Sequence, residues 1–235
     1  MIYILGDIHG YWNLFNIFLN KPQIKENTKI ICCGDFGYFP DQFNFDECIK
    51  NKKGCEIYFC DGNHEHFDHL FKHDVSKRET ITINEKNKIY YQPRGSIKEI
   101  DGINFLFIGG GRSIDKQHRT PGYDWFPEEE IREQDVKHLF ENEYNVDCVI
   151  SHCCPSPIAR SLNGIFRTDG STKILYDVAC KINPEYWYSG HYHMYRNFIY
   201  SDYDEDGNEI FSVDYTCLSY IHSRDRYYTK IKDKK

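Results

Sequence analysis

Aspartate, asparagine and histidine recur, mostly beside glycine, in short polar segments of this 235-residue sequence. The segments are residues 6–10, 34–37, 61–65, 151–152 and 190–193. Seven of their side chains could bind metal: Asp7, His9, Asp35, Asn63, His152, His191 and His193. Imidazoles suit transition metals, a carboxylate can bridge two ions, and an asparagine oxygen binds without adding charge. If these side chains converge, they can hold a pair of divalent cations.

Each polar segment follows a short run of β-branched or aromatic residues, which predicts a β-strand. The predicted strands are residues 2–5, 29–33, 56–60, 148–151 and 186–189, and a helix is predicted over residues 12–20. Such alternation is typical of βα units, in which turns at the strand ends carry functional side chains. Glycine permits the sharp turns, so we expect the seven side chains to gather at one edge.

Two hairpins interrupt the βα alternation. Asp101-Gly102 lies between strands predicted over residues 97–100 and 103–108, and Asp206-Gly207 connects residues 194–200 with residues 209–217. A further helix is predicted to begin at Pro127 and to run to about Glu143. No repeat, low-complexity segment or linker divides the sequence. We therefore expect a single domain over residues 1–235, with an α/β fold in which helices flank a two-sheet mixed β-sandwich.

Composition and charge exclude several classes of protein. The net charge of −7 disfavours long nucleic acid as a partner. No apolar run approaches the roughly 20 residues of a spanning helix, and the first residues lack the pattern of a signal peptide. The ten cysteines include adjacent pairs but no CxxC spacing, which indicates reduced thiols. These features predict a cytoplasmic protein that does not enter membranes.

The ordered motifs resemble the calcineurin-like metallophosphoesterase family. They are Asp7-x-His9, Gly34-Asp35, Gly62-Asn63-His64-Glu65, His152 and Gly190-His191-x-His193. The resemblance implies two metal sites that share Asp35. One would be formed by Asp7, His9, Asp35 and His193, and the other by Asp35, Asn63, His152 and His191. Mn²⁺ is the favoured cofactor at both, with Fe, Zn or Ni as alternatives.

A metal-dependent phosphoric ester hydrolase follows from this resemblance. Two dications and two carboxylates leave a surplus of about two positive charges, which attracts a phosphate anion. The metals activate water, so no protein nucleophile is needed. The resemblance places His64 beside the scissile phosphate, as the candidate general acid.

The sequence departs from the protein serine/threonine phosphatases of this family. Those enzymes carry an acid three residues after the bridging aspartate and then an arginine, where this chain has Tyr38 and Phe39. We expect the missing positive charge to come from the loop after Gly109-Gly110-Gly111. Its Arg112 and Arg119 are the predicted substrate-binding residues, because arginine binds phosphate bidentately.

Three functions remain open at this point. A phosphomonoesterase acting on a phosphorylated small molecule or an exposed phosphate ester is slightly preferred. A phosphodiesterase or nuclease acting on nucleotides or nucleic acid ends is the first alternative. A non-catalytic interaction module on the same fold is the second.

Other polar residues receive structural interpretations. His66, His69 and His73 have helical spacing but no carboxylate partner in the sequence, so we predict surface positions for them. Glu65 is expected to fix a turn or to pair with a coordinating histidine. Cys153 and Cys154 are expected to be buried thiols.

Overall fold

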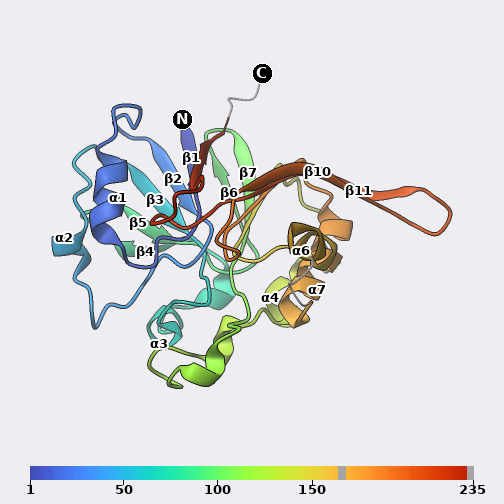
Figure 1. Ribbon diagram of the computed structural model, residues 1–235, viewed down its shortest axis with the longest axis horizontal. Helices are drawn as coiled ribbons and strands as arrows, with labels where there is room; N and C mark the ends of the chain where they lie inside the picture. The colour runs from blue at the N-terminus through green and yellow to red at the C-terminus, as the bar shows by residue number, and fades with distance from the viewer. Residues whose placement is uncertain (164–167, 232–235) are drawn as a thin grey trace.

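The computed structural model describes residues 1–163 and 168–231, which form two mixed six-stranded β-sheets flanked by helices (Figure 1). This architecture confirms the predicted fold class. The first sheet has the order β12-β1-β2-β3-β5-β4. Its strands are β1 (Ile2–Leu5), β2 (Lys29–Cys32), β3 (Glu56–Phe59), β4 (Ile81–Asn84), β5 (Ile89–Tyr91) and β12 (Tyr228–Lys230).

The second sheet has the order β10-β11-β9-β8-β7-β6. Its strands are β6 (Ser96–Ile100), β7 (Ile103–Ile108), β8 (Cys148–Ser151), β9 (Tyr186–Ser189), β10 (Arg196–Tyr203) and β11 (Glu209–Cys217). The β6–β7 and β10–β11 pairs are antiparallel, as the two hairpin signals predict. The β10–β11 hairpin projects away from the body of the protein (Figure 1).

The two sheets pack face to face through alternate side chains of their strands. Ile4 and Ile31 of the first sheet share one buried cluster with Phe105, Phe107 and Ile150 of the second. Full burial of each such side chain contributes roughly 1.5–3 kcal/mol to folding. Because successive side chains of a strand point to opposite faces, every second side chain lies on the outer face of its sheet, where helices must cover it.

Helices cover the outer face of each sheet. Helix α1 (Trp12–Leu19) buries Phe15 and Phe18 against the first sheet. Helices α6 (Ser156–Asn163) and α7 (Gly170–Ile182) cover the second sheet, where Leu175 and Val178 are fully buried. No helix within residues 1–163 and 168–231 is long and apolar enough to cross a membrane.

The helix predicted from Pro127 to Glu143 is wrong, because the segment is broken into three short pieces. They are η3 (Pro127–Glu129), α4 (Glu133–Val136) and α5 (His138–Glu141). The buried Arg94 guanidinium donates to the carbonyls of residues 128, 129 and 130. Those carbonyls are therefore unavailable for the i→i+4 bonds of a continuous helix.

The remaining helices are short and lie in the connections. They are α2 (Phe45–Cys48), α3 (Phe67–Leu70), η1 (Val75–Lys77) and η2 (Lys116–His118). Strands β1, β2 and β3 run parallel in one sheet, and β8 and β9 run parallel in the other. The polar segments predicted to carry chemistry follow the carboxyl ends of these five strands.

Candidate metal centre

The backbone at the strand ends is unusual. His9, Asp35, His191 and His193 all have positive φ angles, of 50°, 46°, 67° and 52°. The left-handed conformation costs a non-glycine residue about 1–2 kcal/mol. Four of the seven candidate ligands have this strained backbone, so the surrounding fold must stabilise it. Such strain is typical of functional sites, where it positions the side chains.

Two glycines allow the carboxylates to approach the turns. A Cβ atom at Gly62 would lie 2.1 Å from Oδ1 of Asp35, and one at Gly190 would lie 1.9 Å from Oδ1 of Asp7. Any larger residue at either position would therefore displace a carboxylate. The glycines of the sequence motifs are explained by this close packing.

One group of candidate ligands converges on the side chain of Asn63. Its Oδ1 lies 2.9 Å from Nε2 of His152 and 3.0 Å from Nδ1 of His191, and these two nitrogens are 3.2 Å apart. His152 Nδ1 lies 2.9 Å from the Cys33 carbonyl, which makes this nitrogen a donor and turns Nε2 toward Asn63 and His191. The Asn63 amide nitrogen donates to Ser113 Oγ (3.1 Å). When His152 is neutral, its Nε2 can direct a lone pair toward the same point as Asn63 Oδ1, and a cation bound there could take both together with His191 Nδ1.

A second group lies on the other side of Asp35. His9 Nε2 and His193 Nε2 are 3.1 Å apart. Oδ2 of Asp7 lies 3.2 Å from His193 Nε2 and 3.7 Å from His9 Nε2. Asp7 also accepts the backbone N–H of His191 at 3.1 Å. Two imidazoles and a carboxylate at these separations fit a transition-metal ion.

Asp35 lies between the two groups. Its Oδ1 is 3.4 Å from Nε2 of His152, while its Oδ2 is 3.6 Å from Nε2 of His9. The His64 backbone N–H donates to Oδ1 (2.7 Å), and the residue is buried. Each oxygen thus faces one group, as a bridging carboxylate requires.

The carboxylates and imidazoles of the two groups shift one another's pKa values. Burial opposes charge on His152, but Asp35 outweighs it and raises the pKa of this imidazole to about 10. Burial and the neighbouring His152 lower the pKa of His191 to about 3. Asp35, despite its burial, has a pKa well below its usual range because of His152 and His64. A hydrogen bond to Asp7 raises the pKa of His193.

His64 lies beside the second group, with its ring 4.9 Å from that of His9. Burial lowers the pKa of His64. Its Nε2 lies 2.6 Å from Nη2 of Arg119, which also pairs with Asp115 at 2.8 Å. The structure thus brings Arg119 to the site. It does not bring Arg112 there in the same way, since that side chain is half exposed and lies 3.9 Å from Glu130.

Sequence reasoning missed two residues that orient Asn63. Buried Glu129 accepts from the backbone N–H (2.7 Å) and the hydroxyl (2.6 Å) of Ser113, whose Oγ accepts from Asn63. Burial raises the pKa of Glu129. The sequence around Glu129 predicts a helix start and does not indicate this contact. The position of Ser113 directly after the glycine loop is the one sequence signal that places it near the site.

Glu65 fixes a turn, as one of its two interpretations predicts. Its carboxylate accepts from the backbone N–H groups of Phe36 (2.7 Å), Gly37 (3.2 Å) and Tyr38 (2.5 Å). These residues directly follow Asp35, so Glu65 holds the loop that presents the central carboxylate. Burial, followed by the charge of Asp35, raises the pKa of Glu65.

The cysteines near the site are structural. Cys153 and Cys154 are buried, as predicted, and burial raises the pKa of Cys154 to about 12. Such thiols are protonated and unreactive near neutral pH.

The fold and the edge of converging imidazoles and carboxylates define an α/β protein with a candidate metal centre. Residues 1–195 match the family model of the calcineurin-like phosphoesterases, so the chain belongs to this family. The family supports a metal-dependent phosphoesterase in general terms. No curated protein matches the chain.

Proposed function

We propose that the chain is a dinuclear-metal phosphoesterase in which Asp35 bridges two divalent cations, Mn²⁺ being favoured. Asp7, His9 and His193 would complete one site, and Asn63, His152 and His191 the other. The observation that carries this proposal is the position of Asp35, whose two oxygens face different groups. When bound, the two cations would supply an activated water and Lewis-acid stabilisation of the phosphoryl oxygens.

The protein's own residues orient and neutralise the substrate in this proposal. Cys33 and Ser113 hold His152 and Asn63 in fixed orientations, which removes the cost of ordering them during binding. Arg119 lies at His64 and can exchange Asp115 for a phosphate oxygen. Arg112 remains a predicted second contact for the phosphate, reached by rotation of its half-exposed side chain.

His64 is the proposed proton donor to the leaving group. In this structure Arg119 lies at its Nε2, which favours the neutral imidazole. Transfer of Arg119 to the phosphate would free Nε2, and the negative charge of the substrate would favour the protonated form. The two residues would thus act in sequence on one phosphoryl group.

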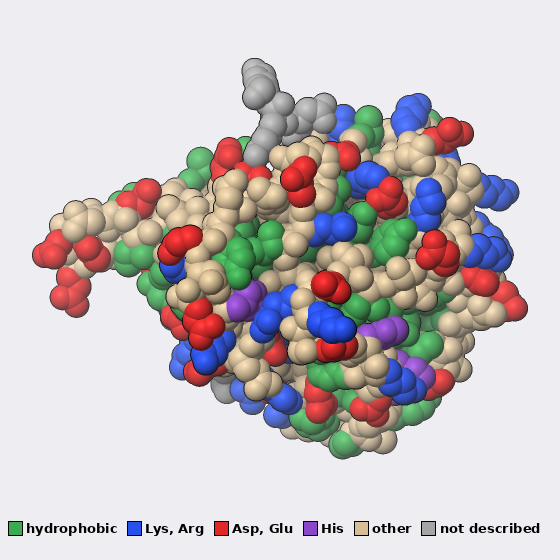
Figure 2. Space-filling view, turned by 180° about the vertical axis from the view of Figure 1, so that it is seen from behind, with side chains coloured by type: hydrophobic (Ala, Val, Ile, Leu, Met, Phe, Trp, Pro, Cys, Tyr) green, Lys and Arg blue, Asp and Glu red, His purple; other side chains and the backbone are tan. Residues whose placement is uncertain are grey.

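A small phosphate ester is the proposed substrate, with a monoester preferred. On the face shown in Figure 2, Lys and Arg side chains are interspersed with Asp and Glu. This face therefore shows no extended cationic track, and the net charge of −7 disfavours a long nucleic acid.

A phosphodiester with an aromatic group is the second candidate, favoured by one observation. Tyr220 lies against His193 at the exposed side of the centre, with ring centroids 4.6 Å apart. Tyr11 and His222 form a stacked pair nearby, 5.3 Å between centroids. These rings could stack on a nucleobase.

Rates on three substrates separate these possibilities. The Mn²⁺-loaded protein should be assayed with p-nitrophenyl phosphate, bis-p-nitrophenyl phosphate and a cyclic nucleotide. Faster monoester turnover supports the first candidate. A preference for the nucleotide that Tyr220→Ala removes supports the second. Absence of turnover on all three, together with fewer than about one bound ion per chain, supports the non-catalytic module.

We also propose a single domain and a cytoplasmic location for the chain. All ten cysteines are free thiols in the structure, and eight of them are buried. Free thiols at this number favour a reducing compartment. Fractionation of cells that produce the tagged protein tests the location, and limited proteolysis tests the domain assignment.

A further inference from the structure

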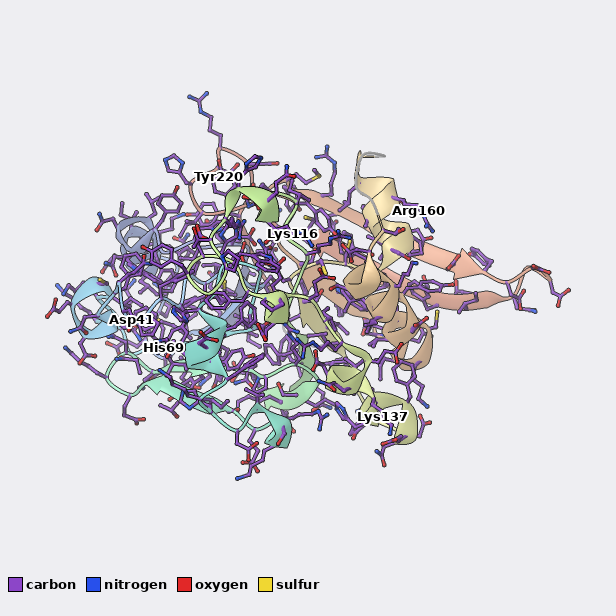
Figure 3. The ribbon with its side chains drawn as sticks, turned by 90° about the horizontal axis from the view of Figure 1, so that it is seen from below. Asp41, His69, Lys116, Lys137, Arg160 and Tyr220 are labelled. Carbon is purple, nitrogen blue, oxygen red and sulfur yellow. The ribbon has the colours of Figure 1, made fainter. Side chains whose placement is uncertain are left out.

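A second group of potential metal ligands lies outside the proposed dinuclear centre. It consists of Asp41, His66 and His69, which we call the rim cluster. Asp41 Oδ2 lies 2.9 Å from Nε2 of His69 and 3.7 Å from Nε2 of His66. All three ligand atoms lie within 4.8 Å of one another. Figure 3 shows Asp41 and His69 beside each other, on a loop and on the adjacent helix.

The fold supplies the carboxylate that the sequence does not place beside these histidines, because Asp41 comes from the loop after β2. His66 directly precedes α3 and His69 lies within it, so their three-residue spacing puts both rings on one face. The rings meet edge-on with centroids 4.5 Å apart.

His66 lacks good hydrogen bonds. Its Nδ1 is buried without a hydrogen-bond partner, and the 3.7 Å from Nε2 to Asp41 is too long for a hydrogen bond. The atom that faces Asp41 is Nε2, which has no hydrogen bond among the described residues and can therefore offer its lone pair to a cation. Burial and the neighbouring His69 lower the pKa of His66, which favours the neutral form that coordinates metals.

The geometry points to a third cation site, for Zn²⁺, formed by Asp41, His66 and His69. Two imidazoles and one carboxylate are a ligand set typical of zinc sites that keep a position for water. Tetrahedral bonds of about 2.0–2.2 Å place neighbouring ligand atoms roughly 3.3 Å apart, between the two distances found here. Small side-chain rotations would complete the site.

Zn²⁺ at the rim cluster would connect two catalytic loops. Asp41 belongs to the loop that begins with Asp35, and His66 to the segment that contains Asn63 and His64. These segments already meet through the His66 N–H, which donates to the Tyr38 carbonyl (2.9 Å). A cation that binds the folded state alone would stabilise this contact and raise the Tm.

One neighbouring charge opposes the cation. Lys72 is exposed, and its Nζ lies 3.4 Å from Nδ1 of His69, the nitrogen that must carry a proton when Nε2 binds metal. Because the side chain is long and solvated, it can turn away. Removing its charge with Lys72→Gln should tighten Zn²⁺ binding about two- to fivefold.

Metal counting tests the proposal in the full chain. Wild type, Asp41→Asn, His69→Gln and the control His73→Gln are saturated with Mn²⁺, exposed to excess Zn²⁺, desalted and analysed for total Mn plus Zn. Wild type and His73→Gln should hold one more ion per chain than Asp41→Asn and His69→Gln. The total is unaffected by exchange of Mn²⁺ for Zn²⁺ at the dinuclear centre.

Equal totals in all four proteins would overturn the inference, as would a Zn²⁺-induced rise in Tm that Asp41→Asn leaves unchanged. Asp41 is an exposed loop residue, so its substitution should not prevent folding. If the dinuclear centre does not bind metal, the total of Mn plus Zn falls in all four proteins. The difference of one ion per chain between wild type and Asp41→Asn is then still expected. The test therefore separates the rim cluster from the proposed function.

Discussion

The proposed dinuclear centre and the rim cluster use the same ligand types, but their aspartates lie in opposite surroundings. Asp35 is 1% exposed and lies among strand ends, strained turns and fixed hydrogen bonds. The Asp41 side chain is 67% exposed and lies in a loop beside a helix of four residues. If both proposals hold, rigidity and not ligand chemistry would distinguish the catalytic site from the stabilising one.

The comparison predicts its largest effect at Asp35. Asp35→Asn keeps the shape but removes the charge that both ions would share, so activity should fall at least about a thousandfold, from a loss of several kcal/mol of stabilisation. Steady-state kinetics and metal analysis measure this. Asp41→Asn is the matched control and should retain most of the activity. Comparable losses in the two variants would contradict the distinction between the sites.

His64 should give the next largest effect, and one that depends on the substrate. His64→Ala removes a proposed proton donor, which typically contributes 10²–10⁴-fold when the leaving group is basic. Phenyl phosphate turnover should therefore fall much more than p-nitrophenyl phosphate turnover, while metal content stays the same. His66→Ala, at the rim, should affect the two substrates equally. Equal losses for both substrates in His64→Ala would argue against the acid role.

Ser113 tests the hydrogen bonds that hold the buried centre. Ser113→Ala removes the acceptor of the Asn63 amide and one of the donors to Glu129, which keeps the backbone N–H of residue 113. Loss of such supporting contacts typically costs 10–100-fold in metal affinity. Titration with Mn²⁺ measures the change. Ser76→Ala, in the exposed η1, is the control. An unchanged affinity in Ser113→Ala would show that Asn63 needs no support.

The smallest predicted effects are changes in KM, which should differ between Arg119→Ala and Arg112→Ala. Arg119→Ala should raise the KM for phosphate esters about tenfold, because a charged hydrogen bond contributes roughly 1.5–3 kcal/mol. Arg112→Ala should change the KM by less, since Arg112 is half exposed and pairs with Glu130. Michaelis–Menten kinetics at saturating Mn²⁺ test both. The reverse order would show that the loop rearranges on binding.

The strands and their turns could be predicted because local signals agree with the fold. Ile2–Leu5, Cys148–Ser151 and Tyr186–Ser189 are strands at the predicted residues, and the predicted runs 29–33 and 56–60 each extend one residue beyond the strand found. Their apolar runs end at glycine or at a polar residue. The seven candidate ligands gather at one edge because parallel strands end there.

The contacts that sequence could not reveal are long-range. Arg94 breaks a helix more than thirty positions away by binding its carbonyls, which no local pattern records. Glu129 accepts from Ser113, which lies sixteen positions earlier, across an intervening loop. Asp41 joins His66 and His69 through a loop whose path depends on the three backbone contacts of Glu65. Each of these depends on tertiary packing, which overrides local propensity.

Anomalous diffraction from Mn²⁺-soaked crystals tests the central claim most directly. The account predicts two peaks on opposite sides of the Asp35 carboxylate, one beside His9 and His193 and the other beside His152 and His191. A single peak, or two peaks that do not share Asp35, would contradict it.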